Sequence, residues 1–178
     1  MKTIIKDDNN KEKEEKKKEF TFDYSFWSHD GFKVNDDGYS DPIDDRYADQ
    51  RKVYDAVGKE ILDNAWLGYN CCLFAYGQTG SGKSYSMVGY KTNKGIVPIS
   101  CEEIFRRIVS TTGPEKKYEV CVSMLEIYNE KVHDLLVPVQ MRPQNGLKVR
   151  ESKTIGIFVE GLTKYPVISY IEIAKKVF

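Results

Sequence analysis

The sequence predicts an α/β domain in which helices flank a central, mainly parallel sheet. Segments with the apolar period of a strand alternate along the chain with segments of helical spacing. One segment, residues 69–76, is almost wholly apolar, which is typical of a strand buried on both faces of a parallel sheet. The chain has 178 residues, 40% of them hydrophobic, which is enough for one domain with its own core.

The N-terminal half of this domain begins with a strand and a helix. Aromatic residues alternate with polar ones over residues 20–26, which predicts a half-buried strand. A polar loop rich in Asp and Gly follows. Helical spacing of apolar residues over 47–65 predicts a helix that Gly68 closes.

The C-terminal half of this domain continues the alternation of predicted helices and strands. A helix that starts near residue 83 is expected to break over residues 89–95 and to resume with Pro98 in its first turn. Residues 118–127 predict another core strand, and residues 147–150 and 157–159 predict a short hairpin. Ser169 and Glu172 form a capping-box pattern that begins a last helix.

Residues 1–19 differ from the rest because lysines and acidic residues dominate them. Such a segment buries too little apolar surface to offset its ordering entropy, so we expect it to be disordered or a frayed, solvated helix. The run Lys16-Lys17-Lys18 is open to binding an acidic partner, but the neighbouring glutamates largely cancel its field. The folded domain is therefore expected over residues 20–178.

Composition excludes several classes of function. The 27 basic residues are balanced by 27 acidic ones, so we expect no nucleic-acid partner and no general membrane-surface binding. No apolar stretch approaches the roughly 20 residues of a membrane span, which predicts no membrane insertion. The four cysteines form no C-x-x-C pair, which indicates neither a disulfide scaffold nor a zinc site.

The residues that indicate a chemical function form a glycine-rich turn between the predicted apolar strand and the following helix. Its sequence satisfies G-x-x-x-x-G-K-[ST], and glycines there allow successive backbone N–H groups to face phosphate oxygens. Lys83 would reach the β- and γ-phosphates of a nucleotide, and Ser84 would offer its hydroxyl to Mg²⁺. The alternative is a glycine-rich turn with a surface lysine. The predicted site residues are Gly77, Gln78, Thr79, Gly80, Ser81, Gly82, Lys83 and Ser84.

The residues around this turn resemble one family. Residues 74–87, Phe-Ala-Tyr-Gly-Gln-Thr-Gly-Ser-Gly-Lys-Ser-Tyr-Ser-Met, resemble the nucleotide loop of the kinesin motor head. Residues 22–28, Phe-Asp-Tyr-Ser-Phe-Trp-Ser, resemble a strand of the third kinesin family of vesicle transporters. Residues 50–54, 95–98 and 123–130 fit the same pattern, and the resemblance extends from Phe20 to Phe178.

The resemblance implies a phosphate-loop NTPase that uses ATP and Mg²⁺ to move along microtubules in the cytoplasm. Tyr85 falls where the family places a ring against the adenine, although a core or surface tyrosine is the alternative. Lys148, Arg150 and Lys153 fall in the hairpin that kinesins lay on β-tubulin, whose acidic surface would attract them. Ordinary solvated charges are the alternative for each of the three.

Parts of the family pattern are missing from this sequence. The switch motifs N-x-x-S-S-R-S-H and D-x-x-G-x-E, which hold the Mg²⁺ water shell and the attacking water, do not occur, and neither does the R-x-R-P of the first strand. We therefore expect about half of a motor head, incomplete in its sheet, with Lys83 as its one catalytic residue. The alternative function is a truncated, non-catalytic fragment that binds nucleotide or tubulin weakly.

Overall fold

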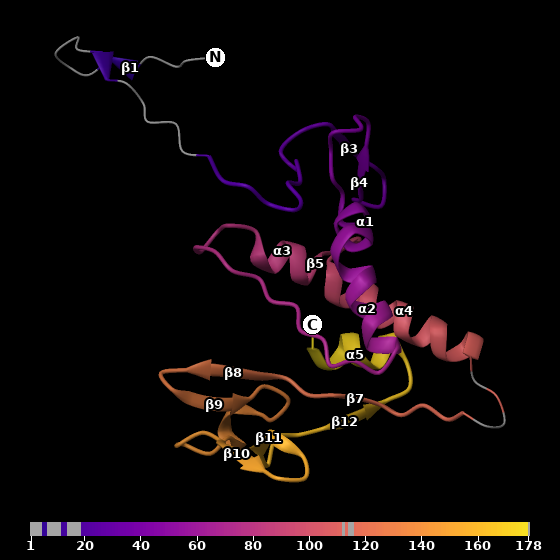
Figure 1. Ribbon diagram of the computed structural model, residues 1–178, viewed down its shortest axis with the longest axis vertical. Helices are drawn as coiled ribbons and strands as arrows, with labels where there is room; N and C mark the ends of the chain where they lie inside the picture. The colour runs from indigo at the N-terminus through magenta and orange to yellow at the C-terminus, as the bar shows by residue number, and fades with distance from the viewer. Residues whose placement is uncertain (1–4, 7–11, 14–18, 112, 114–115, 178) are drawn as a thin grey trace.

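In the computed structural model the described residues are 5–6, 12–13, 19–111, 113 and 116–177. Most of the charged segment 1–19 lies outside them, so its predicted disorder stays a prediction. Within it, β1 (Ile5–Lys6) and β2 (Glu12–Lys13) form a short antiparallel pair. Figure 1 shows the helices grouped together, with the hairpins that follow α4 lying below them.

One continuous helical segment confirms the helix predicted over residues 47–65. It consists of α1 (Gln50–Val53), the π-helical turn η1 (Tyr54–Gly58) and α2 (Lys59–Trp66). Asp49 caps its start, because the Asp49 carboxylate accepts a hydrogen bond of 2.7 Å from the Lys52 N–H. Gly68 ends it with a φ of +94°, as the sequence predicted.

The predicted interruption of the next helix is also confirmed. The helix α3 (Lys83–Met87) is followed by a tight hairpin of β5 (Gly89–Tyr90) and β6 (Asn93–Lys94). The helix α4 (Ile96–Thr111) then carries Pro98 in its first turn, where the missing N–H of proline costs no intrahelical bond.

The core of the described residues lies where η1 meets α4. Tyr54, Ile96 and Ile99 form the buried cluster, and Val53 and Leu73 pack against it. Gly58 allows α4 to approach η1, because a Cβ there would lie 2.9 Å from Cγ2 of Ile96. Among the described residues, no helix is both long and apolar enough to cross a bilayer.

The central, mainly parallel sheet that the sequence predicted is not formed by the described residues. Their strands make two-stranded antiparallel sheets instead. Besides β1–β2 and β5–β6, the pairs are β3 (Phe32–Val34) with β4 (Ser40–Pro42), β7 (Val120–Val122) with β12 (Tyr165–Val167), β8 (Leu125–Tyr128) with β9 (Lys131–Asp134), and β10 (Lys148–Ser152) with β11 (Gly156–Glu160).

Two predicted strands are therefore wrong for this part of the chain. Residues 20–26 form no ladder, and Phe20 and Phe22 are exposed; the adjoining Trp27 makes one isolated parallel bridge, to Tyr47. Residues 69–76 are likewise unpaired, and the side chain of Tyr76 is 94% exposed. A strand requires a hydrogen-bonding neighbour, and no described segment takes that position for either one.

The predicted core strand 118–127 is divided into two. Its first part, β7, pairs with β12, and its second part, β8, turns back on β9. The predicted hairpin of residues 147–159 is confirmed as β10–β11, in which Lys148 lies opposite Glu160 and Val149 lies opposite Val159. The 3₁₀ turn η2 (Val139–Met141) precedes this hairpin.

The last helix, α5 (Tyr170–Val177), begins with the predicted capping box. The Ser169 hydroxyl accepts a hydrogen bond of 3.3 Å from the Glu172 N–H. The Glu172 carboxylate in turn accepts one of 3.0 Å from the N–H of Ile168, one residue before the expected Ser169.

An ion-pair network joins α2 to α4. The Arg107 guanidinium donates to Asp63 at 2.5 Å and to Glu103 at 3.0 Å, and Arg106 donates to the same Glu103 carboxylate at 2.6 Å. These hydrogen bonds, the one from Arg106 foremost, lower the pKa of Glu103 to about 2 against the opposing effect of its burial.

This network predicts a loss of stability in acid. Because the folded-state pKa of Glu103 lies below its ordinary value of 4.5, the stabilisation is complete above that value and is lost as pH falls towards 2. We expect Glu103→Gln to lower the free energy of unfolding by about 1 kcal/mol at pH 7. Urea unfolding, followed by circular dichroism at several pH values, measures the difference from the parent chain.

The difference should shrink below pH 4.5 and vanish near pH 2. Glu60→Gln, at an exposed carboxylate on α2, is the matched control and should have little effect at any pH. A Glu103→Gln deficit of the same size at every pH would contradict the prediction.

Candidate functional site

The glycine-rich turn predicted to bind phosphate leads directly into α3. Three of its glycines have positive φ angles, +150° at Gly77, +81° at Gly80 and +88° at Gly82, which side-chain-bearing residues rarely adopt. A hydrogen bond of 3.1 Å from the Ser81 N–H to the Gln78 carbonyl closes the turn. The predicted loop is therefore present, and it is exposed.

Gly77 is required by space as well as by its backbone angle. A Cβ at this position would lie 2.6 Å from Oγ and 3.2 Å from Cβ of Ser81. The corresponding positions at Gly80 and Gly82 are open, so those two glycines are needed for their angles alone. A side chain at Gly77 would fill the concave side of the loop.

The Lys83 side chain lies across the loop that precedes it. Its ammonium donates to the Gly77 carbonyl at 2.8 Å and to the Gln78 carbonyl at 2.7 Å. An ammonium has three hydrogens, so one is left for an anion at the loop. The cation is thus held where the sequence predicted that phosphates bind.

Ser84 and Tyr85 follow Lys83 in the five-residue helix α3, and both are exposed. Partial burial raises the pKa of Tyr85, and the nearby Tyr47 and Asp49 add to the effect. A ring that is 40% exposed offers a surface on which a base can stack.

Metal ligands from the protein are few in this region. No group of three or more His, Cys, Asp or Glu side chains gathers anywhere in the described part of the chain. The Ser84 hydroxyl could supply one ligand to Mg²⁺, and nucleotide phosphates supply others in sites of this type. The Lys83 ammonium suits the phosphates of Mg·ATP, and the Ser84 hydroxyl suits its metal ion.

Two functional candidates were missed by sequence reasoning. Gln50 and Asn93 are buried amides, and Gln50 donates a hydrogen bond of 2.5 Å to the backbone carbonyl of Tyr85. The sequence placed Gln50 only within residues 50–54, which resemble the kinesin pattern, and indicated no role for it. A single polar residue in a helix or in a two-residue strand gives no pattern that reveals such burial.

The three cations of the predicted microtubule contact lie in the β10–β11 hairpin, and the phosphate loop lies elsewhere. Lys148 and Arg150 are on β10, and Lys153 is in the turn that leads to β11. Arg150 forms an ion pair of 3.1 Å with Glu160, and Lys148 is the cross-strand neighbour of the same glutamate. Lys153 is exposed in the turn. Glu160 therefore offsets part of the charge of Lys148 and Arg150, whereas Lys153 stands away from it. Figure 1 shows this hairpin far from α3.

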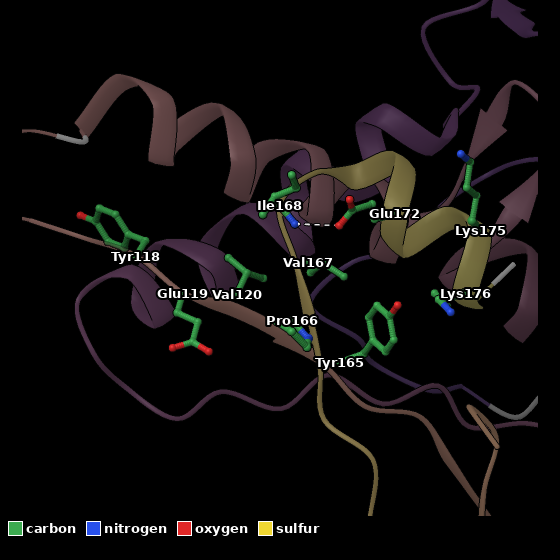
Figure 2. Close-up of a pocket in the computed structure, with 10 residues that line it drawn as sticks. All are labelled: Tyr118, Glu119, Val120, Tyr165, Pro166, Val167, Ile168, Glu172, Lys175 and Lys176. Carbon is green, nitrogen blue, oxygen red and sulfur yellow. Dashed lines mark hydrogen bonds between the residues drawn. The ribbon is translucent and has the colours of Figure 1, made fainter.

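A cavity of about 710 Å³ lies apart from these candidates, between β7, β12 and α5. Figure 2 shows that apolar side chains and the ends of α5 side chains line it, with the Lys176 ammonium 4.3 Å from the centre of the Tyr165 ring. None of the predicted site residues lines this cavity. Its volume alone assigns it no ligand.

The glycine angles and the lysine over the loop, together with the sequence pattern, are those of the phosphate-loop class of proteins. The family model of the kinesin motor domain matches residues 1–177, so the chain belongs to that family.

Curated relatives agree with this assignment. The mouse kinesin-like protein KIF28 is 49% identical over 166 residues, which make up 92% of this chain and 16% of that protein. Kinesin-related protein 1 of Dictyostelium discoideum is 51% identical over 88% of the chain and 7% of its own length. Rat KIF1A is 46% identical over 93% of the chain and 9% of its own length.

Solved structures show the same fold. A KIF14 segment with ADP in complex with a microtubule is 42% identical, with a TM-score of 0.76 over 89% of this chain and 41% of that one. A fast kinesin is 36% identical, with a TM-score of 0.64 over 80% of this chain and 41% of that one. The chain thus has the kinesin motor fold, and it spans less than half of the length of each of these relatives.

The geometry at Gly77 predicts a sensitive position. Gly77→Ala combines an unfavourable backbone angle with the contact to Ser81, so it should reshape the loop and weaken binding of inorganic tripolyphosphate by about tenfold. Isothermal titration calorimetry measures this affinity. Ser81→Gly in the Gly77→Ala background removes the contact and should recover part of the loss; no recovery would mean that the contact is irrelevant.

Proposed function

We propose that this chain is the nucleotide-binding and microtubule-binding part of an ATP-dependent motor. The observation that carries the proposal is the Lys83 ammonium, held over the glycine loop by the carbonyls of Gly77 and Gln78. The similar KIF14 structures support the ligand and the partner, since they are of KIF14 with ADP or AMP-PNP in complex with a microtubule.

The residues of the loop would each have a defined part in the chemistry. Bound Mg·ATP would supply the phosphoryl group whose transfer to water drives a motor. Lys83 would neutralise charge on the transferring phosphate, and the loop N–H groups would hold the phosphates in position. Ser84 would orient the metal through its hydroxyl, and the Tyr85 ring would stack on the adenine.

The microtubule contact would be made by the hairpin β10–β11. Lys148, Arg150 and Lys153 would meet the acidic surface of tubulin, which places the protein in the cytoplasm on the microtubule cytoskeleton. The similarity to KIF1A and to human KIF1B, at 46% and 45% identity, supports a place near the third kinesin family. With 27 basic and 27 acidic residues, we expect no nucleic-acid partner.

A second candidate function is a non-catalytic fragment that binds nucleotide or tubulin weakly. The exposed side chains of Tyr69, Phe74 and Tyr76, in a segment that has no pairing strand among the described residues, favour it. Sequencing the transcript past Phe178 separates the two candidates. An in-frame N-x-x-S-S-R-S-H followed by D-x-x-G-x-E supports the motor, and an early stop codon supports the fragment.

The role of Lys83 gives a direct test of nucleotide binding. Lys83→Ala removes a charge-assisted contact to the phosphates, so ATP affinity should fall by about tenfold to a hundredfold. Fluorescence titration of the chain with a labelled ATP measures this loss, and a full motor head reconstructed around this segment should lose ATP turnover. Lys91→Ala, at an exposed lysine in the β5–β6 turn, is the control and should bind as the parent does. Parent-like affinity of Lys83→Ala would refute the assignment.

The hairpin cations give a separate test of the microtubule contact. Converting Arg150 and Lys153 together to alanine should weaken microtubule affinity roughly two- to thirtyfold at low salt, because each exposed pair contributes about 0.2–1 kcal/mol. The loss should shrink as salt rises. Co-sedimentation with microtubules at low and high salt measures both effects.

Two controls sharpen this test. Lys164→Ala removes an exposed cation outside the hairpin and should change little. Glu160→Gln releases Arg150 from its ion pair and should raise the affinity slightly. Unchanged binding of the double variant at low salt would mean that the hairpin faces away from tubulin.

A further inference from the structure

A buried amide on α1 supports the end of α3. The Gln50 side chain belongs to a residue that is 5% exposed, and its Nε2 lies 2.5 Å from the Tyr85 carbonyl and 3.3 Å from the Asn93 carbonyl. Tyr85 lies in the last turn of α3, where a helix leaves carbonyls without intrahelical donors. Gln50 therefore supplies from another helix a donor that α3 lacks.

Asn93 extends this support to a third segment. Its Oδ1 accepts a hydrogen bond of 2.9 Å from the Ser40 N–H, and its Nδ2 donates one of 2.8 Å to the Gly38 carbonyl. Gln50 and Asn93, which we call the amide clamp, thus join α1, the turn after α3 and the start of β4. Because these amides are buried, breaking one contact leaves polar atoms without partners.

The amide clamp acts on Tyr85 and not on the glycine loop. The loop holds its shape by its own contacts, from the Ser81 N–H and the Lys83 ammonium to the Gln78 carbonyl. The Tyr85 backbone, in contrast, is held by Gln50, and its ring lies near Tyr47 and Asp49 at the start of α1. Loss of the clamp would therefore displace the ring and leave the phosphate cradle in place.

We propose that Gln50 is a positioning residue for the base of the nucleotide: it holds the Tyr85 backbone so that the ring can stack on adenine. This inference rests on the proposed nucleotide site. It separates the recognition of the base, which depends on α1, from the recognition of the phosphates, which depends on the loop.

The test compares two probes, ATP and inorganic tripolyphosphate, by titration calorimetry of the chain. Gln50→Met keeps the length of the side chain but removes its donor, so ATP affinity should fall about fivefold to tenfold. Tripolyphosphate affinity should stay within twofold. Arg51→Met, at the exposed neighbouring position, is the matched control and should leave both affinities unchanged.

A coupling measurement shows whether Gln50 acts through Tyr85. If it does, Gln50→Met in a Tyr85→Ala background should cause no further loss of ATP affinity. Hydrogen exchange of the ligand-free chain provides a second readout, since the amides of residues 83–95 should exchange faster in Gln50→Met. Gln50→Asn, which keeps the amide but is too short to reach, should give the same split between probes if Gln50→Met proves unstable.

The outcomes distinguish a failure of the role of Gln50 from a failure of the nucleotide site. Equal losses of ATP and tripolyphosphate affinity would overturn the role of Gln50 in base positioning, and so would an unchanged ATP affinity. A parent chain that binds neither probe would overturn the nucleotide site itself, and the inference with it.

Discussion

The close approach of η1 and α4 at Gly58 is the contact on which the helical half of the molecule depends. A Cβ at Gly58 would lie 2.6 Å from Cδ2 of Tyr54 and 2.9 Å from Cγ2 of Ile96. Only a glycine leaves room for the Tyr54 ring to lie between the two helices, where it joins Ile96 and Ile99 in the buried cluster. A larger residue would separate the helices and open the core.

The position of Tyr85 depends on this contact although Tyr85 does not touch it. Since α1, η1 and α2 are continuous, the packing at Gly58 also fixes α1, and with it the Gln50 amide that reaches Tyr85. On the other side of the contact, Arg107 of α4 pairs with Asp63 of α2 and keeps the helices in register. A change in the core would therefore reach the nucleotide site through α1.

The parts of the fold that could be predicted are those whose cause is local. Asp49 caps the helix that follows it, Gly68 ends that helix, and the glycines of the loop adopt the angles that their pattern requires. The strands predicted for residues 20–26 and 69–76 are not formed, because the hydrogen bonds of a strand must come from distant segments, which a local pattern does not reveal. The same holds for Gln50, whose polar side chain resembles that of any exposed helix residue until its partner on α3 is known.

The hairpin β10–β11 shows how pairing alone can shape a contact surface. Cross-strand register places Lys148, Arg150 and Glu160 on one face and Val149 and Ile157 on the other, and all five are exposed. Salt would screen the contribution of the charged side chains but not that of Val149 and Ile157, which depends on apolar burial at about 25 cal/mol per Å². A partner that touched both faces would therefore retain part of its affinity at high salt, whereas one that touched the charged face alone would lose most of it.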